Sequence, residues 1–356
     1  MDNINKSTVL ARAFNKLSKN ELIEFMKDKK VGWVLDKKKK RKMDLKNEFL
    51  NLESVLTYEE IVELAEMTVM RKTKGLPAYT YKLRNLGKID GMELKEIKEK
   101  YKRNFPLDNI YEINIIDVIS NGDILEFLIK VKEFDAQWKN NIRDLGTLTA
   151  VYLNKVSINK TTSMISIEVG ADNIAEVIVM FFSSRLGIGM EPYTIGTFNA
   201  TTSERDSATE KTMLIFDFIY NRLPSRGISS NFNDMRFYIS NTANSDGVSG
   251  VTIHGDDIIT SDLACKYITL GNDIISFKAT SVYDGEKVNI NFNLKGKNHD
   301  KLKVVIMDNK SESFKLKVME KIQLEYVLMC THGIMDIGKT RTRLDPIYEK
   351  FVKNNS

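Results

Sequence analysis

The spacing of apolar residues changes close to Pro106, from a helical period to a period of two. Before this proline, apolar residues recur three to four positions apart, which places them on one face of a helix. After it, runs such as Leu125 to Val131 alternate with polar residues, which places the apolar ones on one face of a strand. Helices followed by alternating strands are typical of the α+β class. We therefore expect a helical bundle at 1–106 and a larger α+β domain at 107–356.

The helix starts of the first domain carry capping signals. Three pairs have the capping-box spacing, in which a polar side chain and a carboxylate three residues later each accept a backbone N–H. These pairs are Ser18–Glu21, Thr57–Glu60 and Asp90–Glu93. A turn at Gly75–Pro77 and a polar stretch precede the last of these helices, and Pro106 is expected to end it.

The second domain carries hairpin signals. Asn121-Gly122 and Asp284-Gly285 each lie between alternating runs, and both dipeptides favour the positive φ angles of a tight hairpin turn. Such turns predict antiparallel hairpins or a meander and not βαβ units. The strands expected from the alternation are 148–158, 163–169, 235–240, 248–253, 266–270, 274–283, 287–294 and 302–307.

Two helices are expected to cover the strands. One is capped by Asp172, and the other is opened by Ser207-x-x-Glu210. The loop between them, 187–206, is rich in Gly, Thr and Ser and is a candidate sub-boundary of the second domain. Residues 312–330 fit both a strand and a helix, although their length and their Lys and Glu content favour the helix.

Positive charge is concentrated in the first domain. From Met1 to Pro106 there are 25 Lys and Arg against 16 Asp and Glu, a net charge of +9, whereas the whole chain carries +5. The remainder therefore carries −4. Six consecutive basic residues, Lys37–Lys42, lie in this positive region. A positive domain on a mildly acidic body favours contact with a polyanion.

Several classes of function are disfavoured by composition. No apolar run approaches the roughly 18 to 20 residues that cross a bilayer, and the first residues lack the pattern of a signal peptide. We therefore expect an intracellular, cytoplasmic protein with no membrane partner. Two cysteines and three histidines, none with CxxC spacing, cannot build a zinc site of the usual finger type. No catalytic residue, metal or cofactor is predicted.

The basic run predicts a non-enzymatic nucleic-acid-binding protein. Lys and Arg side chains contact phosphates without regard to sequence, and an aromatic residue nearby can stack on an exposed base or fix the loop to the core. The candidate contact residues are Trp33, Lys37, Lys38, Lys39, Lys40, Arg41, Lys42 and Lys46. The alternative partner is an acidic protein docked on the same loop, as in an assembly component. A solvated loop and a nuclear import signal also fit the run.

Residues 17–52 resemble a SAP-type helix-extended-helix module. The positions that fit the family pattern are Leu17, Glu21, Leu22, Val31, Lys42, Leu45 and Phe49. The connecting segment is several residues longer than the family pattern, and the usual glycine before the second helix is absent. The resemblance implies DNA binding through the connecting segment and the start of the second helix, with Lys39 to Lys42 and Lys46 at phosphates. DNA is therefore favoured over RNA.

Two further motifs match patterns found in nucleotide-binding and metal sites. Gly333 to Thr340 matches GxxxxGK[ST], but no parallel sheet precedes it and Pro346 follows closely, so a chance match is the better interpretation. His254, Asp256, Asp257 and Asp262 could serve a metal-dependent hydrolase, the third candidate function. Neighbouring residues on a strand point to opposite faces, however, and Gly-Asp-Asp is ordinary turn chemistry.

Overall fold

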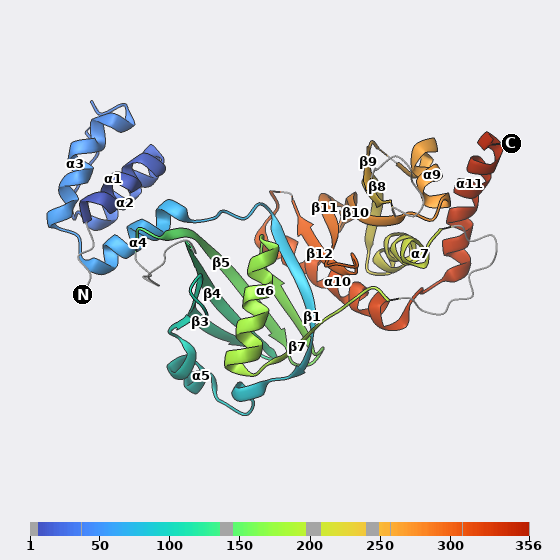
Figure 1. The fold of residues 1–356 in the computed structure, drawn as a ribbon, viewed down its shortest axis with the longest axis horizontal. Helices are drawn as coiled ribbons and strands as arrows, with labels where there is room; N and C mark the ends of the chain where they lie inside the picture. Colours follow the sequence, from blue (N-terminus) through green and yellow to red (C-terminus); the bar gives the residue numbers. More distant parts are fainter. Residues whose placement is uncertain are drawn as a thin grey trace. The chain divides into compact units, whose positions relative to one another are not determined.

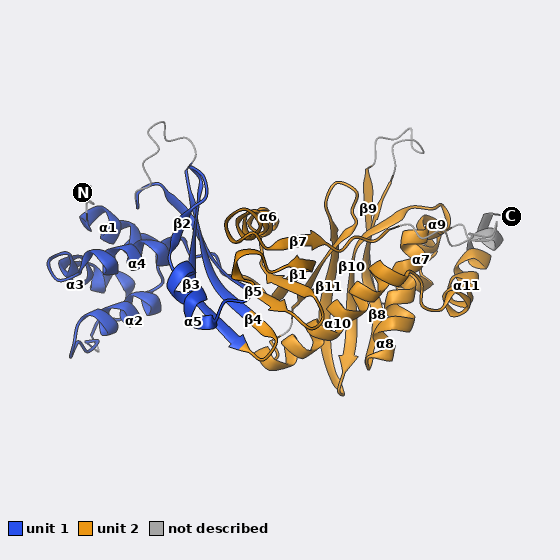
Figure 2. Cartoon of the chain, turned by 90° about the horizontal axis from the view of Figure 1, so that it is seen from below, with its two compact units in different colours: residues 1–72, 91–120, 126–155 blue, residues 73–90, 121–125, 156–356 orange. Residues whose placement is uncertain are grey.

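The chain forms two compact units, shown in Figure 2. The computed structural model describes residues 6–36, 38–135, 145–196, 208–239, 249–256, 258–307 and 309–355. Unit 1 comprises residues 1–72, 91–120 and 126–155, and unit 2 comprises residues 73–90, 121–125 and 156–356. The boundary expected at residue 106 falls inside unit 1. The candidate sub-boundary at 187–206 lies partly outside the described residues.

Unit 1 begins with a group of short helices, here called the helical head (residues 6–69; blue in Figure 1). Its elements are α1 (Lys6–Lys16), α2 (Lys19–Lys29), η1 (Lys42–Leu45), α3 (Lys46–Leu50), η2 (Asn51–Ser54) and α4 (Tyr58–Val69). The capping boxes expected at Ser18 and Thr57 are both present. Apolar side chains of α1 to α4 share one core, in which Phe49 packs between Phe14 and Phe25 at ring-centroid distances of 6.2 Å.

The rest of unit 1 is antiparallel sheet with one helix. The elements are α5 (Leu94–Tyr101), β2 (Asn104–Pro106), β3 (Tyr111–Asn121), β4 (Ile124–Phe134) and β5 (Leu148–Asn159), and the strand order is β2-β3-β4-β5. The β3–β4 turn begins at Gly122, whose φ of +60° explains the glycine. The buried carboxylate of Glu66 on α4 pairs with Lys132 of β4 at 2.9 Å, which ties the helical head to the strands of its own unit.

In unit 2 the strand order of the same sheet continues as β6-β1-β12-β11-β10-β8-β9, and β7 pairs with β1. The strands are β1 (Leu76–Asn85), β6 (Met164–Glu168), β7 (Gly189–Pro192), β8 (Ile228–Tyr238), β9 (Gly250–His254), β10 (Asp273–Tyr283), β11 (Glu286–Lys295) and β12 (Lys301–Ile306). The β10–β11 hairpin pairs Tyr283 with Glu286. Its turn residues, Asp284 and Gly285, have φ angles of +51° and +75°, as the hairpin prediction requires.

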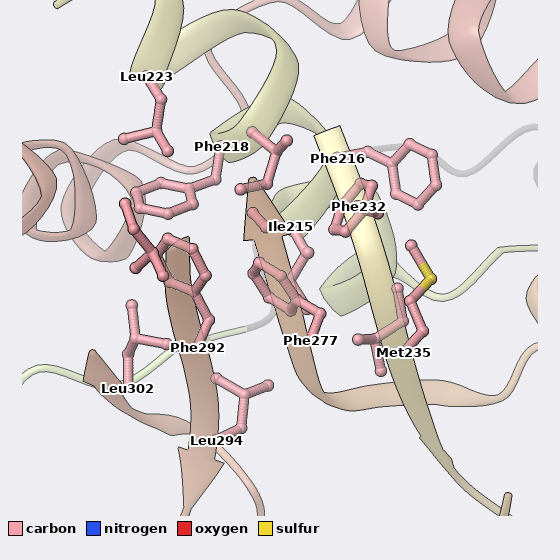
Figure 3. Packing of buried hydrophobic residues seen from close by; sticks show 14 of the residues in the cluster. Ile215, Phe216, Phe218, Leu223, Phe232, Met235, Phe277, Phe292, Leu294 and Leu302 are labelled. Atoms are coloured by element: carbon pink, nitrogen blue, oxygen red, sulfur yellow. The ribbon is translucent and has the colours of Figure 1, made fainter. Parts of the chain in front are cut away.

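The helices of unit 2 bury a large aromatic core against this sheet. They are α6 (Asp172–Phe181), the π-helical turn η4 (Phe182–Leu186), α7 (Glu210–Asp217), the π-helical turn η5 (Phe218–Arg222), α8 (Leu223–Ser225), α9 (Asp262–Thr269), α10 (Glu312–His332) and α11 (Ile337–Asn355). Figure 3 shows Phe216 and Phe218 meeting side chains from β8, β10 and β11. Phe277 and Phe292 stack with centroids 4.7 Å apart. The apolar faces of α7 and η5 therefore cover one face of these strands.

The fold class is confirmed as α+β, with helices first and an antiparallel sheet after them. Individual elements differ from the expectation. Residues 266–270 are not a strand but lie in α9 and the residue after it, because Ala264, Cys265 and Ile268 are buried at helical spacing. The 312–330 segment is helix α10. The polar stretch after Gly75 contains strand β1, which pairs with β6 and β12 and in which Leu76 to Tyr81 are buried.

Three helix starts also differ in detail. The capping pair expected at Asp90–Glu93 is shifted, since Glu93 is the N-cap of α5 and Glu96 completes the box. Ala171 and not Asp172 is the N-cap of α6, and Asp172 instead accepts from Lys303 at 2.6 Å. The N-cap of α7 is Thr209, while Ser207 lies outside the described residues. Among the described helices, none has the length and apolar character needed to cross a bilayer.

Candidate nucleic-acid interface

The basic run lies in the connection between α2 and α3, here called the basic segment (residues 36–46). Its sequence carries seven Lys and Arg against Asp36 and Asp44. The segment runs through η1, where Leu45 is fully buried, and ends at Lys46, the first residue of α3. Lys37 lies outside the described residues.

Trp33 and Lys39 converge on one carboxylate. The indole Nε1 of Trp33 donates to Oε1 of Glu48, and Nζ of Lys39 donates to Oε2 of the same side chain. Both hydrogen bonds lower the pKa of Glu48, and the one from Lys39 has the larger effect. Trp33 is half-buried and packs against the core of the helical head. In this position the ring fixes the loop, which is one of the two roles considered for it.

The backbone of the basic segment is held by further hydrogen bonds. Lys19 of α2 donates to the carbonyl oxygens of Lys39 and Lys40 at 3.2 and 2.8 Å. Asp36 accepts the backbone N–H of Lys38 at 2.9 Å, and Asp44 accepts that of Arg41 at 2.8 Å. The acidic side chains within the segment thus shape its backbone.

Lys42 turns back onto the helical head. Its Nζ lies 5.1 Å from the ring centroid of Phe14 and donates to the carbonyl oxygen of Asn15 at 3.2 Å. A cation over an aromatic face is stabilised by the ring quadrupole, so Lys42 has a structural role comparable to that of Lys39. Lys39 and Lys42, both predicted to contact phosphate, therefore form contacts within the chain.

Four basic side chains of the segment point to solvent: Lys38, Lys40, Arg41 and Lys46 are exposed. None of these side chains forms a hydrogen bond or an ion pair with another described residue. The segment therefore presents four cations without acidic partners among the described residues, on a backbone that is held by hydrogen bonds from Lys19, Asp36 and Asp44. This arrangement suits contact with a row of phosphates, since little side-chain pairing has to be broken first.

Exposed apolar side chains lie beside these cations. Val31 is 100% exposed, Val34 is 80% exposed, and Met43 is 63% exposed. Sequence reasoning gave no surface role to these residues, and Val31 occupies the position of the apolar residue that ends the link in the SAP-type pattern. The other apolar positions of that pattern, Leu17, Leu22, Leu45 and Phe49, are buried. A surface that mixes basic and apolar side chains also suits a protein partner.

The GxxxxGK[ST] match does not have the architecture of a phosphate-binding loop. Helix α10 precedes it, and α11 begins within it at Ile337. The Thr340 side chain is buried and donates to the carbonyl oxygen of Asp336 at 2.8 Å, while Lys339 pairs with Asp336 at 3.2 Å. A strand followed by a glycine-rich loop is required for the nucleotide cradle, so the interpretation as a chance match is supported.

The acidic residues near His254 are dispersed. His254 Nδ1 lies 3.1 Å from Oδ1 of Asp234, and Asp256 accepts from Asn233 at 3.2 Å. Asp262, at the start of α9, pairs with Lys350 of α11 at 2.7 Å. Asp257 lies outside the described residues. Within the part of the chain that the structure describes, no group of three His, Cys, Asp or Glu side chains could hold a metal ion.

Comparison with known proteins gives no further guide to the site. No protein-family model matches the chain, and no curated protein sequence is significantly similar to it.

Proposed function

We propose that this protein is a non-enzymatic DNA-binding protein that contacts phosphates through the basic segment. The observation that supports the proposal is the set of four outward cations, Lys38, Lys40, Arg41 and Lys46, on a hydrogen-bonded backbone. Duplex DNA is favoured over RNA because of the SAP-type resemblance of residues 17–52. Contact is mainly electrostatic and independent of sequence.

The test is fluorescence anisotropy with labelled duplex DNA, single-stranded DNA and RNA at low salt. A variant with Lys38, Lys40, Arg41 and Lys46 changed to Gln is expected to lose at least tenfold in affinity for duplex DNA. The matched control changes four exposed lysines of unit 2 to Gln: Lys266, Lys287, Lys297 and Lys317. Equal losses in both variants would indicate a general charge effect and would contradict the assignment to the basic segment.

A second candidate is docking of an acidic protein on the same surface, which the exposed Val31 and Val34 favour. Replacing both valines with Ser discriminates between the two functions. Phosphate contact should survive this change, because neither side chain carries charge. A protein partner that covers the apolar pair should be released, and excess duplex DNA should not displace it from the unmodified chain.

A further inference from the structure

Unit 2 contains an open-mouthed cavity of about 690 Å³ that is remote in sequence from the basic segment. Its lining residues come from helix α11, from the 3₁₀ turn η6 (Ile258–Thr260), from α9 and from η5. The volume lies within the roughly 300–1,000 Å³ range of small-molecule sites. Its lining is drawn from Tyr220, Asn221, Ile259, Thr260, Cys265, Lys339, Thr342, Arg343, Pro346, Ile347 and Lys350.

One face of α11 supplies the charged side of the cavity. Lys339, Arg343, Ile347 and Lys350 recur at three- or four-residue spacing, so they share a helix face. Lys339 and Lys350 are eleven residues apart, which corresponds to roughly 16 Å along the axis. The two lysines therefore mark opposite ends of the cavity, and Arg343 and Ile347 lie between them.

The π-helical turn η5 contributes two side chains, Tyr220 and Asn221, to the lining. Tyr220 packs against Phe216 and Phe232 at centroid distances of 5.8 and 5.6 Å, so its ring is fixed by the core of unit 2. Asn221 donates to Asp217 at 2.9 Å and to Thr340 at 3.0 Å. Wide turns of this kind occur often at functional sites, because the extra residue re-aims side chains.

The lining also includes apolar side chains from α9, η6 and α11. Ile347 and Cys265 are almost fully buried, and Ile259 packs against the same core. Desolvation raises the pKa of Cys265, so its thiol is neutral at physiological pH and behaves as a small apolar group. These side chains can hold a ring or an aliphatic body, but they do not supply a nucleophile.

The three cations that line the cavity differ in whether a carboxylate neutralises them. Lys339 pairs with Asp336 at 3.2 Å, and Lys350 pairs with Asp262 at 2.7 Å. Arg343 lies over the Tyr220 ring, 5.3 Å from its centroid, and has no carboxylate partner among the described residues. Two of the three lining cations are thus paired with carboxylates, and the charge of Arg343 is left over. A single anionic group beside Arg343 would therefore balance the cavity.

We propose that this cavity binds a small organic anion, in which an aromatic or apolar body carries one carboxylate, sulfonate or phosphate group. The anionic group contacts Arg343, and the body lies between Tyr220, Ile259 and Ile347. Arginine suits this role because its planar guanidinium can donate two parallel hydrogen bonds from its edge to an oxyanion while its face stacks on a ring. The site is distinct from the basic segment and does not depend on DNA binding.

The test is a fluorescence titration with 1-naphthyl phosphate and 1-naphthol, in which inorganic phosphate is measured by its displacement of bound 1-naphthyl phosphate. The intact protein is expected to bind 1-naphthyl phosphate saturably at one site and to bind each of the other two at least tenfold more weakly. Arg343→Gln is expected to weaken 1-naphthyl phosphate binding about tenfold, the usual cost of losing a charged hydrogen bond. Lys287→Gln removes an exposed cation elsewhere in unit 2 and is expected to leave the affinity unchanged.

A second variant locates the site. Thr342 is exposed at the rim of the cavity, so Thr342→Trp should fold normally and obstruct entry of the probe. Circular dichroism confirms the fold of each variant. The absence of saturable binding to the intact protein would overturn the proposal. Unchanged affinity in both Arg343→Gln and Thr342→Trp would also overturn it, because the probe would then be bound elsewhere.

Discussion

Lys39 forms an ion pair with Glu48, although it lies in the middle of the basic run from which phosphate contacts are expected. Its neighbour Lys40 is exposed and has no such partner among the described residues. Adjacent lysines in one run therefore have different roles. The pair Lys39 and Lys40 provides a direct comparison between a structural cation and one that is free to meet phosphate.

Lys40→Gln is expected to reduce the slope of log affinity for duplex DNA against log salt by about 0.9, the contribution of one phosphate contact. Its thermal midpoint should not change, since the side chain has no partner to lose. Lys39→Gln is expected to show the reverse pattern, with a lower thermal midpoint and a nearly unchanged slope. Salt-series anisotropy and thermal denaturation measure the two effects, and equal slopes for the two variants would contradict the distinction.

Trp33→Phe tests the role of the indole. The variant keeps an aromatic ring for packing but loses the hydrogen bond from Nε1 to Glu48. The free energy of unfolding should fall by about 1 kcal/mol, the usual net value of a hydrogen bond. Affinity for single-stranded DNA should stay within twofold. A large loss of single-strand affinity with unchanged urea stability would instead identify Trp33 as a stacking residue.

Asp172 should make the stability of unit 2 depend on pH under acidic conditions. Desolvation alone would raise its pKa, but hydrogen bonds from Lys295, Lys303 and Tyr79 outweigh it and lower the pKa to about 2. A carboxylate with a depressed pKa contributes stability above its unfolded pKa, near 4, and loses that contribution as the pH falls toward 2.

The matched variant is Asp172→Asn. At pH 7 it should be less stable than the unmodified protein by roughly 1 kcal/mol, a value reduced from the full linkage because the side chain is partly exposed. The difference should narrow between pH 4 and pH 2. Urea denaturation followed by circular dichroism across this range provides the measurement. A difference that is constant with pH would contradict the assigned cause.

Asp217 is expected to be among the most sensitive positions of unit 2. Its fully buried carboxylate accepts the backbone N–H groups of Met335 and Asp336 at 2.8 and 3.1 Å and pairs with Arg222 at 3.2 Å. Asp217→Asn keeps the shape but leaves Arg222 without one of its counter-charges, so about 3 kcal/mol should be lost. Asp345→Asn, an exposed change on α11, is the control and should change urea stability by less than 0.5 kcal/mol.

The elements predicted well from sequence are those whose signals are local. The capping boxes at Ser18 and Thr57 and the Asp284-Gly285 hairpin each depend on a few neighbouring residues with strict backbone requirements. Alternation in β11 was equally informative, because one face of that strand is buried and the other carries asparagines. Local chemistry alone determines these features.

The features that were missed depend on contacts distant in the sequence. Strand β1 does not alternate, because Leu76 to Tyr81 are buried on both faces between β6 and β12. The separation of the basic run into exposed cations and cations bound within the chain depends on Glu48 and Phe14. Glu48 is near in the sequence but is one of several nearby carboxylates, whereas Phe14 is distant and reaches Lys42 only through the fold. The cavity likewise combines η5, η6 and α11, and no single stretch of sequence contains its pattern.

The most direct test of DNA binding by the basic segment is the salt dependence of duplex affinity. The intact protein should show a log–log slope of about −3 to −4, which corresponds to the four outward cations Lys38, Lys40, Arg41 and Lys46. Changing all four to Gln should bring the slope close to zero. An unchanged slope in that variant, or no duplex binding by the intact protein at low salt, would contradict the account.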